Sequence, residues 1–268
     1  MIDVVIPAHK KDVDTLELCI ESIRKNVKNV RRIIVVSKEK LTEKAEFYCE
    51  EDFPFSFEDV GNIVGFHRKT FNYYGGLIQT TSALVIPDLL RDVLVCDADT
   101  IFLKEVEFVN SEGIALYNAS YDIPSHVTSH PYLEHMEKLI PGLTKQTKYS
   151  GICHHILIQK DILQEMFERV EKIHKMPFWK ADISVTLQDY KSLKPKPSHG
   201  QAPLLFTTYE LYFNYVLKYH KERVALRLQK SILAYKGKMG VSTEVVHNFP
   251  SRTNLFGNVQ ILPKQEEN

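Results

Sequence analysis

Cysteine is scarce in this chain, and its few copies are widely separated. The 268 residues include four cysteines, at positions 19, 49, 96 and 153, and no two of them form a CxxC pair. Two of the four, Cys96 and Cys153, lie inside apolar runs. We therefore expect buried, reduced thiols and a cytoplasmic location.

The chain also lacks net charge and long apolar segments. Lysine plus arginine equals aspartate plus glutamate at 34 each, so nothing global attracts nucleic acid or an acidic membrane. No segment approaches the roughly 20 apolar residues that a membrane span needs. The opening run, residues 1–7, has neither a basic leader nor a cleavage site. We expect no nucleic-acid partner, no transmembrane segment and a cytoplasmic protein.

Internal repeats and low-complexity tracts are absent as well. The hydrophobic content of 44% over 268 residues suits one large α/β domain with a substantial core. We predict a single domain over residues 1–260. We expect residues 1–104 and 105–260 to form its two halves and residues 261–268 to form a flexible tail.

The first forty residues read as a strand, a helix and a second strand. Val4–Pro7 and Arg32–Ser37 are continuous apolar runs, typical of buried parallel strands. Between them, apolar residues recur at helical spacing over Thr15–Asn26. This βαβ unit predicts a Rossmann-like, mainly parallel twisted sheet flanked by helices.

Further along, the pattern predicts more alternation of strands and helices. The expected helices lie at 41–50, 71–87, 131–139, 160–175 and 208–219. The expected strands lie at 91–96, 113–118, 151–159 and 245–254. We expect irregular structure at 52–62, with a short strand, and a long surface loop at 176–203, which holds four prolines.

Two aspartates follow the third strand directly, in the run Asp97-Ala98-Asp99. Carboxylates two residues apart point to opposite faces of a strand, but at the carboxyl end the chain turns and both can address one point. Ligands bind at such ends in open α/β sheets. Paired carboxylates suit Mg²⁺ or Mn²⁺, and such a cation neutralises a departing diphosphate. A solvated turn is the alternative.

Three segments resemble the GT-A glycosyltransferases, and in particular a little-characterised bacterial and large-virus set of such proteins. Residues 3–12 are similar to the first strand and donor loop of that family. Residues 93–103 resemble its DxD segment, and Tyr149-Ser150-Gly151-Ile152 resembles the strand that follows. The resemblance spans roughly residues 3–250 and implies a GT-A fold. It also implies transfer of a sugar from a nucleotide-diphosphate donor, bound by residues 1–104, to a glycan or other hydroxyl acceptor, bound by residues 105–260.

The resemblance implies roles for particular residues. Asp97 and Asp99 would hold the Mn²⁺ or Mg²⁺ ion and the donor, with His247, after a predicted strand, as a third metal ligand. The implied nucleotide-pocket residues are Pro7, Ala8, His9, Lys10, Ser37, Lys38, Asp97, Ala98 and Asp99. The simpler alternatives are an ordinary polar loop at His9 and a hydrogen-bonded histidine at His247.

Glu210 and Asp99 are the two predicted catalytic carboxylates. An inverting transferase needs a base for the acceptor hydroxyl, and the aromatic neighbours of Glu210 would desolvate it and raise its pKa. In a retaining enzyme Glu210 would bind the acceptor instead, and a packed helix glutamate is the plain alternative. Asp182 and Asp189 compete for the role of base. Of the adjacent His154 and His155, at most one can face the site if both lie on a strand.

Other function classes remain open from the sequence. A haloacid-dehalogenase-like phosphatase also has an Asp-x-Asp after a strand, but about 90 residues precede it here and the later acidic pair is missing. A nucleotidyltransferase would have a glycine-rich loop where this chain has Pro-Ala-His-Lys-Lys. The non-enzyme alternative is an inactive sugar-binding transferase fold.

Overall fold

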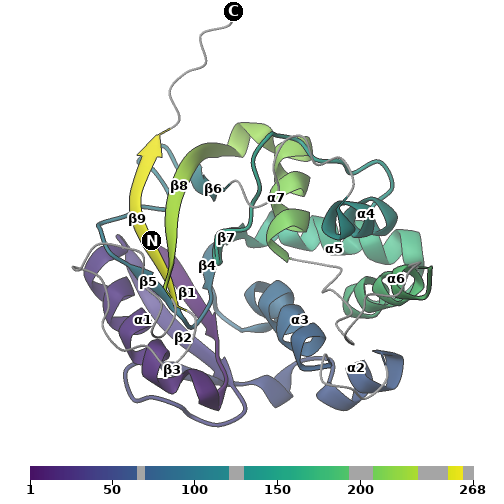
Figure 1. Cartoon of the computed structure of the whole chain (residues 1–268), viewed down its shortest axis with the longest axis horizontal. Coiled ribbons are helices and arrows are strands. Elements are labelled where there is room, and N and C mark those ends of the chain that lie inside the picture. The colour runs from purple at the N-terminus through teal and green to yellow at the C-terminus, as the bar shows by residue number, and fades with distance from the viewer. Residues whose placement is uncertain (65–69, 121–129, 193–207, 235–252, 262–268) are drawn as a thin grey trace, which may run out of the picture.

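The computed structural model describes residues 1–64, 70–120, 130–192, 208–234 and 253–261. They form an α/β structure with a central, mainly parallel sheet flanked by helices, as the sequence predicts (Figure 1). None of the helices among these residues is both long and apolar enough to cross a membrane.

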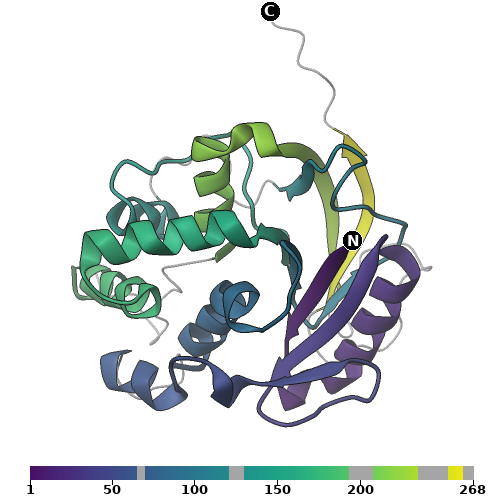
Figure 2. The same ribbon diagram turned by 180° about the vertical axis from the view of Figure 1, so that it is seen from behind.

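The larger sheet has the strand order β3-β2-β1-β4-β7. Its strands are β1 (Ile2–Pro7), β2 (Val30–Ser37), β3 (Glu46–Cys49), β4 (Asp92–Cys96) and β7 (His155–Gln159). The first four are parallel to one another, and β7 is antiparallel to β4. Helices cover both faces, with α1 (Val13–Asn26) on one side and α3 (Thr70–Val85) and α5 (Lys160–His174) on the other (Figures 1 and 2).

The predicted βαβ unit is confirmed. Strands β1 and β2 pair in parallel, with Pro7 opposite Val36, and α1 connects them after the short 3₁₀ helix η1 (Lys10–Asp12). The helix buries the stripe that contains Leu16 and Cys19. Because helices cover both faces of the sheet, its inner strands are continuously apolar and do not alternate between apolar and polar residues.

A second, four-stranded sheet has the order β5-β9-β8-β6. Its strands are β5 (Thr100–Phe102), β6 (Ala115–Ala119), β8 (Val224–Ala234) and β9 (Thr253–Ile261). Strand β9 is parallel to β5 and antiparallel to β8. The predicted strand at 245–254 overlaps β9 only at its end, because 235–252 lie outside the described residues.

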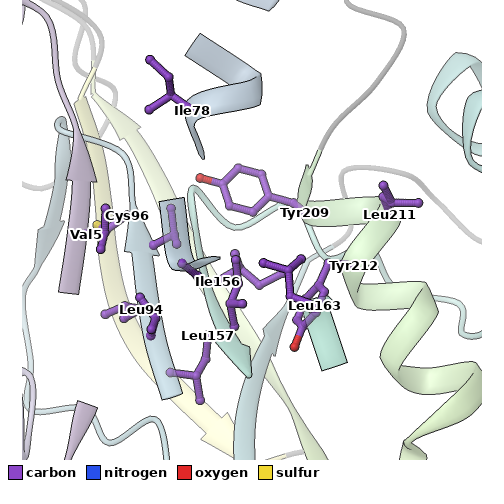
Figure 3. Close-up of a cluster of buried hydrophobic side chains, with 14 of the residues drawn as sticks. Val5, Ile78, Leu94, Cys96, Ile156, Leu157, Leu163, Tyr209, Leu211 and Tyr212 are labelled. Carbon is purple, nitrogen blue, oxygen red and sulfur yellow. The ribbon is translucent and has the colours of Figure 1, made fainter. Parts of the chain in front are cut away.

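The remaining helices gather mainly beside α3 and α5. They are α2 (Phe57–Val64), α4 (Pro131–Leu139), α6 (Phe178–Ser192) and α7 (Thr208–Tyr219), with the short 3₁₀ helices η2 (Glu50–Asp52) and η3 (Lys221–Arg223). Helices α4 and α7 match their predicted bounds. In Figure 3, Tyr209 and Tyr212 of α7 lie in the same apolar cluster as Leu94 of β4 and Leu157 of β7.

The structure corrects the prediction of a helix at 41–50. That stretch contains edge strand β3, where Glu46 receives a paired hydrogen bond from Arg32 of β2. This cross-strand ion pair stabilises the extended conformation relative to the helical one.

The two regions expected to be irregular contain helices. Helix α2 begins after a capping box, because Ser56 Oγ accepts from the Asp59 amide and Asp59 accepts from the Ser56 amide. Helix α6 lies between the prolines, since 178–192 contain none. Its first residue, Phe178, stacks on Phe167 of α5 at 3.8 Å between ring centroids. The single-domain boundaries and their division near residue 104 stay a prediction.

Candidate functional site

Three of the predicted site segments lie at one edge of the larger sheet. Because β1, β2 and β4 are parallel, the chain leaves all three at their shared carboxyl edge. The predicted loop after β1 continues the ladder by one bond, from the Ala8 amide to the Val36 carbonyl at 2.9 Å. This edge therefore brings together Pro7–Lys10, Ser37–Lys38 and Asp97–Asp99, at the place where open α/β sheets bind ligands.

The loop after β1 is held by its own hydrogen bonds. The His9 amide donates to Asp12 Oδ2 and His9 Nδ1 accepts from the Lys11 amide, each at 3.2 Å. These bonds cap η1 and fix the direction in which the chain enters α1. The His9 ring meets the exposed ring of Phe71 edge to face at 6.3 Å. The loop is thus preorganised rather than an unstructured connection.

The two lysine side chains at this edge are exposed, whereas the serine hydroxyl is buried and hydrogen-bonded. The side chains of Lys10 and Lys38 are 77% exposed, and their ammonium groups lie 3.2 and 3.8 Å from glutamates. Such exposed pairs contribute little and exchange readily, so both cations can turn toward an anionic ligand. The buried Ser37 instead donates its hydroxyl to the Glu39 carbonyl at 2.8 Å, which shapes the turn after β2.

The chain turns after β4 as the sequence predicts. The Thr100 amide donates to the Asp97 carbonyl at 3.0 Å, and Ala98 is buried within this turn. The thiols of Cys19 and Cys96 also reach the same carbonyl, at 3.7 and 3.5 Å. Buried free thiols are confirmed at Cys19, Cys96 and Cys153, whereas Cys49 is only half-buried.

Asp97 is surrounded by donors on both carboxylate oxygens. Its Oδ1 accepts from Gln79 Nε2 and from the Tyr209 hydroxyl, each at 2.6 Å. Its Oδ2 lies 2.9 Å from Nδ1 of His154. The Asp97 side chain remains 28% exposed. A carboxylate has about four acceptor positions, so this arrangement orients Asp97 and still leaves it able to bind a cation.

The surroundings of Asp99 oppose the ionisation of its carboxyl group. Burial is the main cause that raises its pKa from 3.8 to about 6, and the neighbouring Asp97 charge adds to the effect. A divalent cation would offset both the cost of burying the Asp99 charge and its repulsion by Asp97, because the cation supplies the opposite charge.

The adjacent histidines face different surroundings, although only His155 lies on the strand that the prediction assumed for both. His154 precedes β7 with φ of 59°, a left-handed conformation that is unusual outside glycine. This conformation lets its carbonyl accept from the Asp97 amide at 2.9 Å while its ring contacts the Asp97 carboxylate. His155 is buried with Nε2 at 2.6 Å from Asn118 Nδ2, and burial lowers its pKa to about 3. His154 therefore belongs to the site and His155 to the interior.

Glu210 lies in the first turn of α7 and is completely buried. Its Oε2 accepts from the Ser150 hydroxyl at 2.8 Å and from the Gly151 amide at 2.9 Å, and Oε1 accepts from Asn214. Burial raises its pKa, in the direction expected from its aromatic neighbours. These contacts fasten α7 to the turn before β7, so the bonding seen here is structural and the catalytic role stays a prediction.

Replacing Glu210 with glutamine should lower the free energy of unfolding by about 1–3 kcal/mol, because an amide NH₂ replaces an acceptor that faces buried donors. Urea unfolding near neutral pH measures the change, with Glu112→Gln as the exposed control. Full stability would contradict the anchoring function. Near-complete transfer activity in a folded Glu210→Gln protein would contradict the role as base.

The competing carboxylates lie elsewhere. Asp182 of α6 is buried beside His135 of α4, with Oδ1 at 3.3 Å from the His135 Nε2 atom. Burial raises its pKa to about 8. It serves the α4–α6 contact. The side chain of Asp189 lies outside the described residues.

The donor set suits a cation that is shared with a ligand. Within the described ranges, no three His, Cys, Asp or Glu side chains gather into a metal-binding group. His247, the predicted third ligand, lies outside the described residues. Two carboxylates fit Mg²⁺ or Mn²⁺, which are bound by one or two carboxylates plus substrate phosphates rather than by a full protein cage.

Sequence reasoning missed two residues that contact Asp97. Gln79 lies in the middle of α3, where a polar residue gives no signal. Tyr209 is visible only as an aromatic neighbour of Glu210, and sequence alone does not show which of the two faces the aspartates. Only the packing of α3 against β4 and of α7 against α3 brings both to the site.

No protein-family model matches the chain, and no curated protein sequence matches it. Among solved structures, apo mouse xyloside xylosyltransferase 1 is similar over 84% of this chain and 85% of that chain, with 10% identity and a TM-score of 0.41. The galactosyltransferase LgtC with donor and acceptor sugar analogues is similar over 68% of each chain, with 16% identity and a TM-score of 0.36. An active-site mutant of LgtC covers the same shares, with 15% identity and a TM-score of 0.37. Such low values establish no shared activity, so the residues of this chain must carry any functional conclusion.

Proposed function

We propose that this chain is a metal-dependent glycosyltransferase of the GT-A type, which transfers a sugar from a nucleotide-diphosphate donor to an acceptor hydroxyl. The observation that carries the proposal is the pair Asp97 and Asp99 at the carboxyl end of β4, where the Asp97 charge helps to raise the Asp99 pKa to about 6. Two repelling, partly buried carboxylates are a site that a divalent cation completes.

The neighbouring segments suit the rest of a nucleotide-sugar donor. The bound Mn²⁺ or Mg²⁺ ion would neutralise charge on the departing diphosphate, held by Asp97 and Asp99, with His247 as a proposed third ligand. Lys10 and Lys38 present exposed ammonium groups at the same edge. Pro7, Ala8 and His9 form the preorganised loop along which the nucleoside would lie.

The compartment and the acceptor belong to the same proposal. The four cysteines are free thiols, which supports a reducing, cytoplasmic compartment. Residues 105–260 would shape the site for a glycan or other hydroxyl acceptor. Glu210 would serve there as base in an inverting enzyme, or as an acceptor contact in a retaining one.

A panel of nucleotide sugars tests the proposal by thermal unfolding. UDP, GDP, CMP and ADP sugars are added with and without Mn²⁺ to the wild type, to Asp99→Ala and to the exposed control Glu112→Ala. A ligand at a hundred times its Kd stabilises the folded state by about 2.7 kcal/mol. We expect one nucleotide to raise the melting temperature in a Mn²⁺-dependent manner in the wild type and the control, but not in Asp99→Ala.

Other outcomes separate the rival functions. No shift with any nucleotide sugar would refute the proposal and direct attention to a phosphatase. A Mn²⁺-dependent shift without sugar transfer to any acceptor would indicate an inactive sugar-binding fold. Release of inorganic diphosphate from a nucleoside triphosphate and a sugar phosphate would identify a nucleotidyltransferase.

A further inference from the structure

Two residues outside the Asp97–Asp99 segment hold one oxygen of Asp97 from opposite directions. Gln79 comes from α3 and Tyr209 from the first turn of α7. Gln79 Nε2 lies 2.6 Å from Asp97 Oδ1 and 2.7 Å from the Tyr209 hydroxyl, and that hydroxyl lies 2.6 Å from the same Oδ1. The three polar atoms form a closed triangle.

The hydrogens of this triangle have one consistent arrangement around an ionised Asp97. The carboxylate only accepts, and the single tyrosine hydrogen can be donated once. Tyr209 therefore donates to Asp97 Oδ1. The glutamine NH₂ group has two hydrogens, so it donates to Oδ1 and to the tyrosine oxygen. Every donor hydrogen of the triangle is then used. Rotation of the Asp97 carboxylate away from this orientation would break its hydrogen bonds with Gln79 and Tyr209.

Tyr209 is itself fixed by its surroundings. It is 6% exposed, and in Figure 3 its ring crosses the apolar cluster so that its hydroxyl points away from α7 toward β4 and α3. The next residue, Glu210, fastens the same turn of α7 to Ser150 and Gly151. The helix that supplies the donor therefore cannot shift without breaking buried hydrogen bonds.

We propose that Tyr209 and Gln79 are positioning residues that lock the Asp97 carboxylate in the orientation needed to bind the divalent cation. The inference rests on the function proposed above, since it assigns a task to residues that need not touch the donor or the metal. Neighbours that orient a ligating carboxylate change metal affinity by about 10–100-fold when they are replaced. The two positioning residues come from α3 and α7, one in each predicted half of the chain, and both donate to the same atom, Asp97 Oδ1.

The test measures Mn²⁺ binding directly from the electron paramagnetic resonance signal of free Mn²⁺. It is made with and without a nucleoside diphosphate (UDP, GDP or ADP), against matched samples that lack protein, because the proposed site shares its cation with the donor. The variants are Tyr209→Phe, which removes only the hydroxyl, and Gln79→Met, which keeps the length of the side chain. The matched control is Tyr215→Phe. The Tyr215 hydroxyl donates to Glu165 Oε1 at 2.6 Å from the same helix, so this change removes the same kind of bond away from Asp97.

We expect Tyr209→Phe and Gln79→Met each to weaken Mn²⁺ binding by about 10-fold or more, and Tyr215→Phe to leave it within about 2-fold of the wild type. The double variant should lose less than the product of the single losses, because both residues act on one oxygen. Circular dichroism and melting temperature establish the folded fraction. If Tyr209→Phe does not fold, Gln79→Met decides the question alone.

Two results would overturn the inference in distinguishable ways. If the wild type binds Mn²⁺ and Asp97→Ala does not, while Tyr209→Phe and Gln79→Met bind like Tyr215→Phe, the positioning function is wrong and the proposed metal site stands. If the wild type binds no Mn²⁺ even with a nucleoside diphosphate present, the metal-dependent function fails and the inference fails with it.

Discussion

Replacing Asp99 with asparagine is expected to make the metal-free protein more stable near neutral pH, while abolishing its Mn²⁺-dependent binding of the donor. Folding buries Asp99 beside Asp97 and raises its pKa from 3.8 to about 6. The ionised carboxylate therefore opposes folding. Asparagine removes that charge, and the gain should be about 1–3 kcal/mol.

The sign of the effect appears in its pH dependence. The pKa of Asp99 is higher in the folded state than in the unfolded state, so the folded state holds the proton more tightly. Stability therefore falls as pH rises between about 4 and 6. Above that window the penalty is constant. The stability difference between Asp99→Asn and the wild type should grow through the same window and then level off. Urea unfolding at a series of pH values, without divalent cations, measures it.

The matched control makes the same change of charge at the neighbouring position. Asp97→Asn should destabilise the protein by about 1–3 kcal/mol, because an amide NH₂ would face the donors Gln79, Tyr209 or His154. Both variants should lose the Mn²⁺-dependent shift, and with it at least about 100-fold in transfer rate, because the cation stabilises several kcal/mol of charge in the transition state. A loss of stability in Asp99→Asn across the whole pH range would contradict the electrostatic account.

Adding one methyl group to Gly151 is expected to be the most damaging small change to the fold. A Cβ built on Gly151 would lie 2.5 Å from the Phe213 Cβ atom and 2.8 Å from the Tyr209 carbonyl oxygen. Backbone and Cβ atoms cannot move aside as a flexible side-chain end would. Overpacking of this kind costs about 1–3 kcal/mol or more, and α7 would have to retreat from the turn that Glu210 fastens.

The consequence should extend to the site, since the retreating helix carries Tyr209. We expect Gly151→Ala to lose about 2–3 kcal/mol or more in urea unfolding and also to bind Mn²⁺ more weakly. Gly75→Ala is the control. No atom lies within 4 Å of a Cβ there, and alanine in the middle of α3 should stabilise by about 0.4–1 kcal/mol. Equal stability of the two variants would refute the close approach of α7 to this turn.

Much of the fold was predictable because local patterns and tertiary packing agree. The apolar runs of β1, β2 and β4 are long enough to indicate burial on both faces, and helical spacing marks α1, α4 and α7. The failures at β3 and α6 have local causes. An edge strand with exposed residues such as Phe47 lacks the pattern of a buried strand, and the flanking prolines concealed a proline-free helix.

The site was predictable where chemistry is concentrated in a short segment. Asp97 and Asp99 are adjacent to a strand end, and the parallel order of β1, β2 and β4 brings the predicted loops to the same edge. Gln79 carries no such signal, and its role depends on α3 crossing near the end of β4. The direction of Tyr209 toward Asp97, and of Glu210 toward Ser150, depends on the rotation of α7 about its axis.

Local sequence patterns are enough to predict the α/β class, the opening βαβ unit and the acidic turn after β4, because each depends on residues close together in the chain. Tertiary packing establishes which side chains contact Asp97, which histidine lies at the site and that Glu210 holds a turn. Those contacts join residues 18 to 112 positions apart. The physical reason is that a buried hydrogen bond is specified by the relative placement of whole helices and strands, which no local pattern encodes.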